Sequence, residues 1–277
     1  MIFEEMLFDG EKGFRSDFSS NIDFIIDRIL LMPKYRPFLL SEVVDLCLLY
    51  LGFLDFKEKL LFHAVHECPV LIRRLYIKGA YNFSDLGRFV KGPGLSFFQF
   101  YFHDTISGFE ERLQNIEYFD KYFHQIVQNK NDLNNLIEYG FLPSMIEYSL
   151  KYDDHEKIND YFTVSNTNKE ISLIWSPFEW AMKPTSLDPL SFSGIFGSIK
   201  CFRLFLIRGY KFNKSIIQNV VMGGSIEIFH LCPLNKDYFK SLLYNASKCC
   251  HFHLVLYFME QMSNENRKDI DMLFKLY

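Results

Sequence analysis

The sequence predicts an all-α protein in which an N-terminal helical region precedes a solenoid of stacked short helix pairs. The main observation is a repeat with a period of 27 residues, because a fixed period of about 20–50 residues is typical of stacked repeats. No segment has a clear strand pattern. The repeating positions are Leu190, Gly197, Phe202 and Leu204, then Ile217, Gly224, Phe229 and Leu231, then Tyr244, His251, Leu256 and Phe258.

One repeat shows how the pattern predicts two helices. Leu190 and Ser193 share one face of a first helix, and Gly197 ends it, since a tight turn between helices often needs positive φ. The apolar residues of 201–206 form one side of a second helix, which Gly209 closes. Two short helices cannot bury their apolar faces alone, so the pairs are expected to stack on neighbours.

The N-terminal region is predicted to be helical at 22–32, 41–51, 56–67, 69–77 and 84–89. Pro33 and Pro37 are expected to interrupt the chain, and Ser41 to cap the second of these helices. Pro69 and Gly79 mark the start and the end of the fourth helix. The aromatic segment 97–102 could be either helix or strand.

The middle of the chain continues the helical pattern. A long periodic helix is predicted at 109–129, a second-helix-like segment at 132–139 closed by Gly140, and a helix pair at 144–152 and 155–162. The interval from Ile146 to Leu190 is 44 residues, 17 more than the period, so an inserted turn or an irregular repeat is expected there. A helical turn is predicted at 177–182. The expected domains are 1–140, which could hold degenerate repeats, and 141–277, the repeat domain.

Several of these segments resemble a large, divergent ankyrin-type protein family that is expanded in parasitic protists. The resemblance rests on Trp175-Ser-Pro-Phe-Glu-Trp180-Ala-Met-Lys, Gly197-Ser-Ile-Lys-Cys-Phe202, Gly223-Gly-Ser-Ile-Glu-Ile-Phe-His230 and Met145-Ile-Glu-Tyr-Ser-Leu-Lys-Tyr-Asp153-Asp154. It covers residues 142–258 and implies an ankyrin-like fold, binding to other proteins and no catalytic residues. The Thr-Pro-Leu-His start of an ordinary ankyrin repeat is absent, and His251 stands where a turn glycine is expected.

Composition narrows the function classes. Residues 1–155 hold 16 Lys and Arg against 23 Asp and Glu, and residues 156–277 hold 14 against 11. Neither half has the basic stripe typical of nucleic-acid binding. The longest apolar run, 46–54, is shorter than the roughly 20 residues that a membrane span needs. Six cysteines in 277 residues do not indicate a disulfide framework. A cytoplasmic location is therefore expected.

One cluster suggests metal chemistry. Cys249, Cys250, His251 and His253 carry the thiolate and imidazole groups that zinc prefers, but adjacent cysteines do not have the usual spacing of a zinc site. Other His, Asp and Glu clusters and the Lys91-Gly-Pro-Gly94 loop also lack the spacing of known sites. No metal site, cofactor or catalytic residue is predicted.

The function expected from the sequence is non-catalytic protein recognition by an unidentified protein partner. The candidate binding residues lie after the second helix of the best repeat (Tyr210, Lys211 and Asn213) and near that repeat (Trp180 and Lys183). One alternative is a zinc-dependent protein or enzyme that uses Cys249, Cys250, His251 and His253. Another, suggested by the many aromatic residues, is a structural or self-associating protein.

Overall fold

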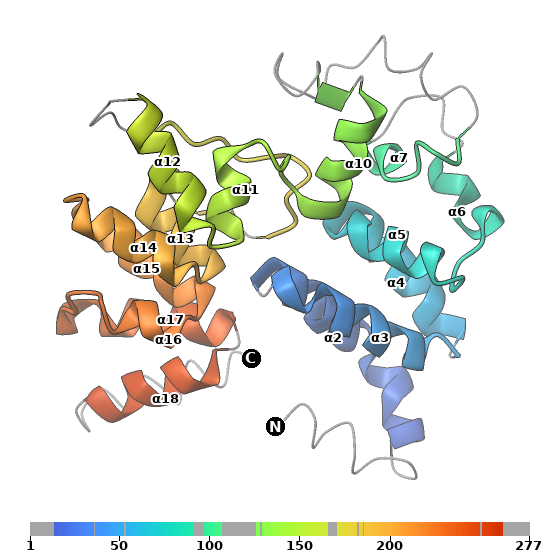
Figure 1. Ribbon diagram of the computed structural model, residues 1–277. Helices are drawn as coiled ribbons and strands as arrows, with labels where there is room; N and C mark the ends of the chain where they lie inside the picture. Colours follow the sequence, from blue (N-terminus) through green and yellow to red (C-terminus); the bar gives the residue numbers. More distant parts are fainter. Residues whose placement is uncertain are drawn as a thin grey trace. The chain divides into compact units, whose positions relative to one another are not determined.

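The computed structural model describes residues 14–35, 37–52, 54–90, 97–106, 126–127, 129–165, 171–181, 183–184, 186–249 and 251–262. All regular secondary structure in these ranges is helical (Figure 1). The chain forms two compact units, an N-terminal unit of residues 1–34 and 38–118 and a C-terminal unit of residues 35–37 and 119–277. The all-α prediction is confirmed. The long helix expected at 109–129 lies almost entirely outside the described residues.

The N-terminal unit is a group of helices whose apolar faces pack together. Its core includes Ile26, Val43, Leu60 and Leu71, each at most 1% exposed. Segment 97–102, which the sequence left open, begins as a helix. The elements are α2 (Phe14–Tyr35), the 3-10 helix η1 (Pro37–Leu39), α3 (Leu40–Tyr50), α4 (Leu54–Glu67), α5 (Pro69–Ile77), α6 (Phe83–Val90) and α7 (Phe97–Phe100).

Local signals set the ends of α5 as expected. Pro69 occupies the first turn, and Gly79 has φ +78°. The Ala80 N–H then donates to the Leu75 carbonyl at 2.9 Å, which closes the helix. Two predictions for the preceding helices, an interruption at Pro33 and a helix cap at Ser41, were wrong. Pro33 lies inside the last turn of α2, and Ser41 lies within α3, whose N-cap is Leu39.

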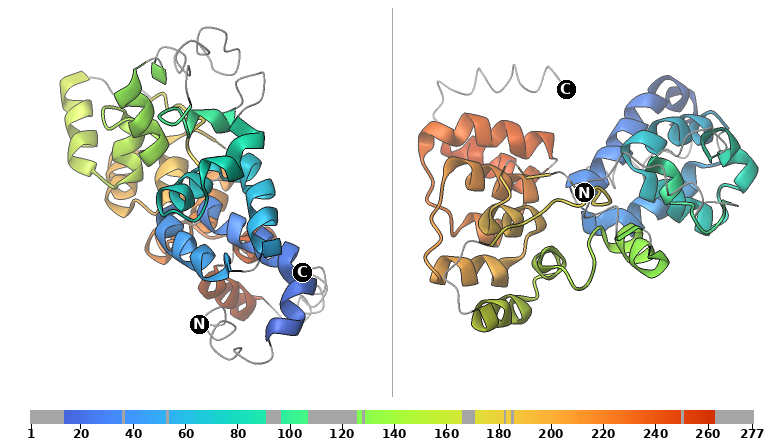
Figure 2. Two further views of the ribbon diagram at one scale, coloured as in Figure 1. Left: turned by 90° about the vertical axis from the view of Figure 1, so that its right-hand side faces the viewer. Right: turned by 90° about the horizontal axis from the view of Figure 1, so that it is seen from above.

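The C-terminal unit consists largely of helix pairs in two layers (Figures 1 and 2). The first helices of successive pairs pack as α11, α13, α15 and α17, and α12, α14 and α16 form a second row. The elements are α10 (Lys130–Tyr139), α11 (Ile146–Lys151), α12 (His155–Ser165), α13 (Pro189–Phe196), α14 (Ile199–Ile207), α15 (Lys214–Gly223), α16 (Ile226–Phe229), η3 (Lys236–Tyr238), α17 (Phe239–Lys248) and α18 (Phe252–Gln261).

Glycines allow close packing of α13 against α15. A Cβ atom on Gly223 would lie 2.1 Å from the Gly194 carbonyl oxygen and 2.7 Å from that of Ile195. A Cβ on Gly194 would lie 2.8 Å from a methyl carbon of Val220. The helices therefore meet at backbone level, and larger side chains would push them apart.

The repeat register shifts by one residue in the third pair. Gly197 and Gly224 have φ +70° and +73°, and Ser198 and Ser225 follow as the N-caps of α14 and α16. In the third pair the N-cap of α18 is His251. Hence His251 corresponds to these serines rather than to the turn glycine, and the spacing of 27 residues becomes 26.

Burial supports the shifted register. The residue four positions after each N-cap is buried, namely Phe202, Phe229 and Val255. Leu256, which the 27-residue period aligns with Phe202, is 60% exposed. The hydrogen bonds agree, because the His251 N–H donates to the Ala246 carbonyl as the Ser198 N–H does to that of Ser193, both at 2.9 Å.

The extra residues between α12 and α13 form an irregular segment. Its described residues from 171 to 188 contain no regular helix, and the expected helical turn at 177–182 is reduced to a simple turn at 177–178. Trp175 anchors the segment in an aromatic core, with ring centroids 5.8 Å from Phe141, 5.5 Å from Phe192 and 6.0 Å from Phe196. We call residues 171–188 the insertion.

Candidate functional site

A buried ion pair joins α11 to the insertion. The ammonium of Lys151 lies 2.7 Å from a carboxylate oxygen of Glu179, and these side chains are 1% and 0% exposed. Lys151 Nζ also donates to the Tyr139 carbonyl at 2.9 Å, and Glu179 Oε1 accepts from the Ala181 N–H at 2.9 Å. Each charged group thus has several partners, as burial of charge requires.

Aromatic rings surround the same ammonium. Lys151 Nζ lies 4.1 Å from the Trp180 ring centroid, 5.6 Å from that of Phe196 and 5.8 Å from that of Tyr152. Burial lowers the pKa of Lys151 and raises that of Glu179, against the mutual attraction of the two charges. A lysine of lowered pKa can act as a nucleophile, but this amine is enclosed and already bonded. We therefore interpret the ion pair of Lys151 and Glu179 as a structural link that positions Trp180 and the backbone at Tyr139.

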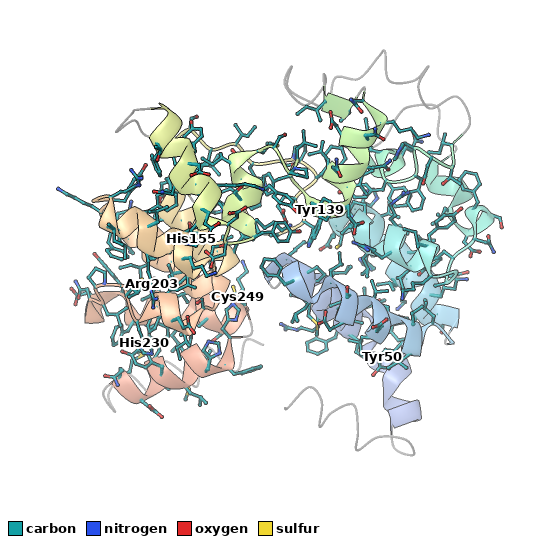
Figure 3. All side chains as sticks on the ribbon, in the orientation of Figure 1. Tyr50, Tyr139, His155, Arg203, His230 and Cys249 are labelled. Carbon is teal, nitrogen blue, oxygen red and sulfur yellow. The ribbon has the colours of Figure 1, made fainter. Side chains whose placement is uncertain are left out.

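Three tyrosines lie beside this ion pair and form what we call the tyrosine cluster. The ring centroids of Tyr148 and Tyr152 are 4.5 Å apart, and Tyr139 lies 5.7 and 6.4 Å from them in edge-on contacts. Tyr139 ends α10, and the other two come from α11 and the turn after it; Figure 3 labels Tyr139. Tyr152 is 42% exposed, and partial burial raises its pKa to about 12.

A second buried carboxylate fixes the insertion to α11. Glu147 is 3% exposed, and its Oε1 accepts a hydrogen bond from the Ile174 N–H at 2.8 Å. Burial raises the pKa of Glu147 above its ordinary value, and the hydrogen bond from the Ile174 N–H offsets only part of that rise. Glu147 and Lys151, one helical turn apart on α11, therefore bind the insertion at Ile174 and at Glu179.

The structure places the predicted binding residues in two regions. Trp180 belongs to the surroundings of Lys151, and Lys183 is exposed on the insertion. The other three precede α15. Tyr210 packs edge-on against Phe205 at 5.2 Å, Lys211 is exposed, and Asn213 caps α15 by accepting from the Ile216 N–H at 2.9 Å.

In the segment from Cys249 to His253, both imidazoles contact backbone carbonyls at the end of α15. His251 Nε2 lies 2.7 Å from the Met222 carbonyl oxygen, and His253 Nε2 lies 3.0 Å from that of Gly224. Cys249 is buried, and Cys250 lies outside the described residues. Within the described ranges, no group of three His, Cys, Asp or Glu side chains could hold a metal ion.

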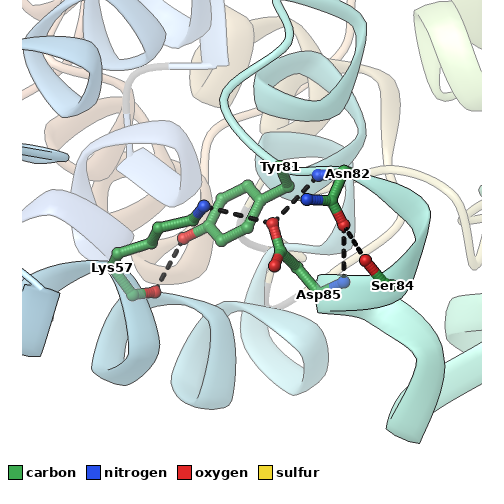
Figure 4. A network of polar contacts seen from close by, with 5 residues as sticks. All are labelled: Lys57, Tyr81, Asn82, Ser84 and Asp85. Atoms are coloured by element: carbon green, nitrogen blue, oxygen red, sulfur yellow. Dashed lines mark hydrogen bonds and ion pairs between the residues drawn. The ribbon is translucent and has the colours of Figure 1, made fainter.

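A polar network in the N-terminal unit caps α6 (Figure 4). Asn82 Oδ1 accepts from the Asp85 N–H at 2.9 Å, and Asp85 Oδ2 accepts from the Asn82 N–H at 3.0 Å. This reciprocal pair is a capping box. Lys57 Nζ adds an ion pair to Asp85 at 3.1 Å, and Tyr81 donates to the Lys57 carbonyl at 2.8 Å. The network joins α4 to the start of α6, which is a structural role.

Comparisons with protein-family models, curated proteins and solved structures gave no match to this chain. The likeness to ankyrin-type proteins therefore stays a prediction. Within the part of the chain that the structure describes, no helix combines the length and the apolar character needed to cross a bilayer.

Proposed function

We propose that this protein is a non-catalytic recognition scaffold, a divergent ankyrin-like solenoid that binds a protein partner through the tyrosine cluster and the adjoining insertion. Stacked helix pairs provide an extended surface that such scaffolds use for binding. Among the residues that the structure describes, no contact favours the zinc-dependent alternative.

The observation that carries the proposal is the combination of a partly exposed tyrosine cluster with a fixed support. Tyrosine and tryptophan are enriched among the residues that dominate binding energy at protein interfaces. Here Lys151 and Glu179 fix Trp180 and the backbone that bears Tyr139. Because the support is already ordered, little conformational freedom would be lost on binding.

The test is site-specific photo-cross-linking in the full-length chain. A benzoylphenylalanine at position 152 is compared with one at position 244, since Tyr152 and Tyr244 are both 42% exposed and Tyr244 lies on α17, outside the tyrosine cluster. We expect a discrete protein adduct from position 152 that position 244 does not give, and a lower yield when Tyr148→Ala is added.

Three results would contradict the proposal: identical adducts from both positions, no adduct from either, or an adduct from position 152 that Tyr148→Ala leaves unchanged. Elemental analysis of the same preparation addresses the alternative. Stoichiometric zinc that is lost in His251→Ala and His253→Ala would favour a metal-dependent protein.

A further inference from the structure

The C-terminal unit has two oppositely charged regions. Residues 129–165, which contain α10 to α12, hold seven Asp and Glu and three Lys, a net charge of −4. Residues 171–262 hold five Asp and Glu and nine Lys and Arg, a net charge of +4. The tyrosine cluster thus lies in the acidic region, and the later repeats are basic.

Some of the basic residues recur where the chain enters a first helix. Lys183 lies on the segment that leads to α13, Lys211 and Lys214 lie on either side of the cap of α15, and Lys240 is in the first turn of α17. All four are exposed. We call Lys211, Lys214 and Lys240 the lysine ridge.

The helix packing brings the starts of α15 and α17 together. Lys214 Nζ lies 5.1 Å from the ring centroid of Tyr238, the N-cap of α17. The C-terminal ends also correspond, because a Cβ on Gly224 would meet the His251 ring at 2.2 Å. The two helices therefore run in the same direction, and the lysine ridge occupies one edge of the first-helix layer.

Some lysines of the molecule are ion-paired, and the two at the start of α15 are not. Lys34, Lys57, Lys59, Lys151 and Lys157 each have a carboxylate within 3.3 Å. Within the described part of the chain, Lys211 and Lys214 of the lysine ridge form no ion pair. Both residues are exposed, and exposed positive charge favours encounter with an anionic partner.

From this distribution we infer that the lysine ridge binds an acidic peptide segment of the partner protein. Tyr210 and Tyr238 lie beside the lysines in the chain and offer aromatic contact area to such a segment. A long nucleic acid fits less well, because the same unit carries a net charge of −4 in residues 129–165, which would repel a continuous polyanion. The inference rests on the proposed recognition function and names the chemistry of its partner.

The experiment measures binding of a fluorescein-labelled acidic peptide, a 12-residue Glu/Ser/Gly sequence, to the full-length protein by fluorescence anisotropy at low and near-physiological salt. The test variant is Lys211→Glu/Lys214→Glu. The matched control is Lys200→Glu/Arg203→Glu, which changes the net charge equally at exposed positions of α14. We expect at least tenfold weaker binding for the ridge variant and less than threefold for the control, with affinity falling as salt rises.

Three outcomes would overturn the inference: no peptide binding by the wild-type chain, equal losses in the two variants, or tighter binding of a 12-nucleotide single-stranded DNA than of the peptide. The cross-linking at Tyr152 does not depend on these lysines. A discrete adduct there together with no peptide binding would therefore refute the acidic partner while leaving the recognition scaffold in place.

Discussion

Ion pairs in the two units of the molecule differ in their surroundings. In the N-terminal unit, the side chains of Lys57 and Asp85 are 28% and 30% exposed, and their ion pair is screened by water. In the C-terminal unit, Lys151 and Glu179 are almost completely buried. The first pair adds little to stability, whereas the second leaves an uncompensated buried charge if either partner is lost.

Two glycines from each unit also differ in the space that surrounds them. Cβ atoms on Gly52 and Gly79 of the N-terminal unit would meet nothing within 4 Å. Those on Gly223 and Gly224 would collide with a carbonyl oxygen and with the His251 ring. The C-terminal unit thus contains contacts that leave no room for an added atom, whereas Gly52 has open space around it; Gly79 also has open space, but its φ of +78° makes any side chain strained.

The largest difference is expected between the two ion pairs. Lys151→Met should lower the free energy of unfolding by about 3–5 kcal/mol because Glu179 stays buried and unpaired. Lys57→Met should cost at most about 1 kcal/mol. Urea denaturation measures both. Lys151→Met/Glu179→Gln should recover part of the loss, and equal costs for the two single variants would refute this comparison.

The close contact of α13 and α15 gives the next largest effect. Gly223→Ala should destabilise by roughly 1–3 kcal/mol, since the added methyl group must displace the backbone of α13. The control Gly52→Ala adds the same atom in open space and should change the free energy of unfolding by less than about 1 kcal/mol. Thermal denaturation followed by circular dichroism compares the two, and similar melting temperatures would contradict the packing.

Alanine substitutions at Gly224 and Gly209 would separate the cost of backbone strain from the cost of a steric collision. Both have positive φ, of +73° and +87°, so alanine at either position is strained. Only Gly224→Ala would also meet the His251 ring. We expect it to be about 1 kcal/mol more costly than Gly209→Ala. Adding His251→Ala to both should reduce that difference, and an unchanged difference would argue against the contact.

The smallest effects concern pH and have opposite signs in the two units. Burial raises the pKa of Glu147 above 4.5, so its favourable contribution is present at low pH and is lost as pH rises through the raised value. Arg73 lowers the pKa of Asp104 from 3.8 to about 2, so that contribution is present above 3.8 and is lost as pH falls towards 2.

Glu147→Gln should therefore gain stability relative to wild type as pH rises from 4 to 7. Asp104→Asn should lose stability relative to wild type as pH rises from 2 to 4. Denaturation across this pH range checks both slopes, and parallel slopes for the two variants would show that the carboxylates do not differ as described.

Local chemistry explains which parts of the fold were predictable. Pro69 and Gly79 defined α5 to the residue, and Gly140 closes α10 at φ +80° as its pattern predicted. A helix start or stop depends on residues within one or two turns, which the sequence displays directly. The 27-residue period aligns His251 with the turn glycines, because the sequence does not display the backbone hydrogen bonds that make His251 the N-cap of α18.

The candidate site was less accessible to prediction. Glu147 and Lys151 stand four residues apart, a spacing typical of an exposed pair on one helix. Instead, each binds a different part of the insertion, and the carboxylate that neutralises Lys151 lies 28 residues later. Trp180 is among the binding residues predicted from the sequence and its neighbour Glu179 is not, because a segment without periodicity gives no signal of burial.

The backbone contact of α13 with α15 has a consequence for how this part of the protein opens. With no side chain between Gly223 and the Gly194 carbonyl, neither helix can loosen without moving the other. The two should behave as one cooperative unit, whose amide hydrogens exchange with solvent together and among the slowest in the chain. The stability of this helix pair would then limit how long the surface that we propose for binding keeps its shape.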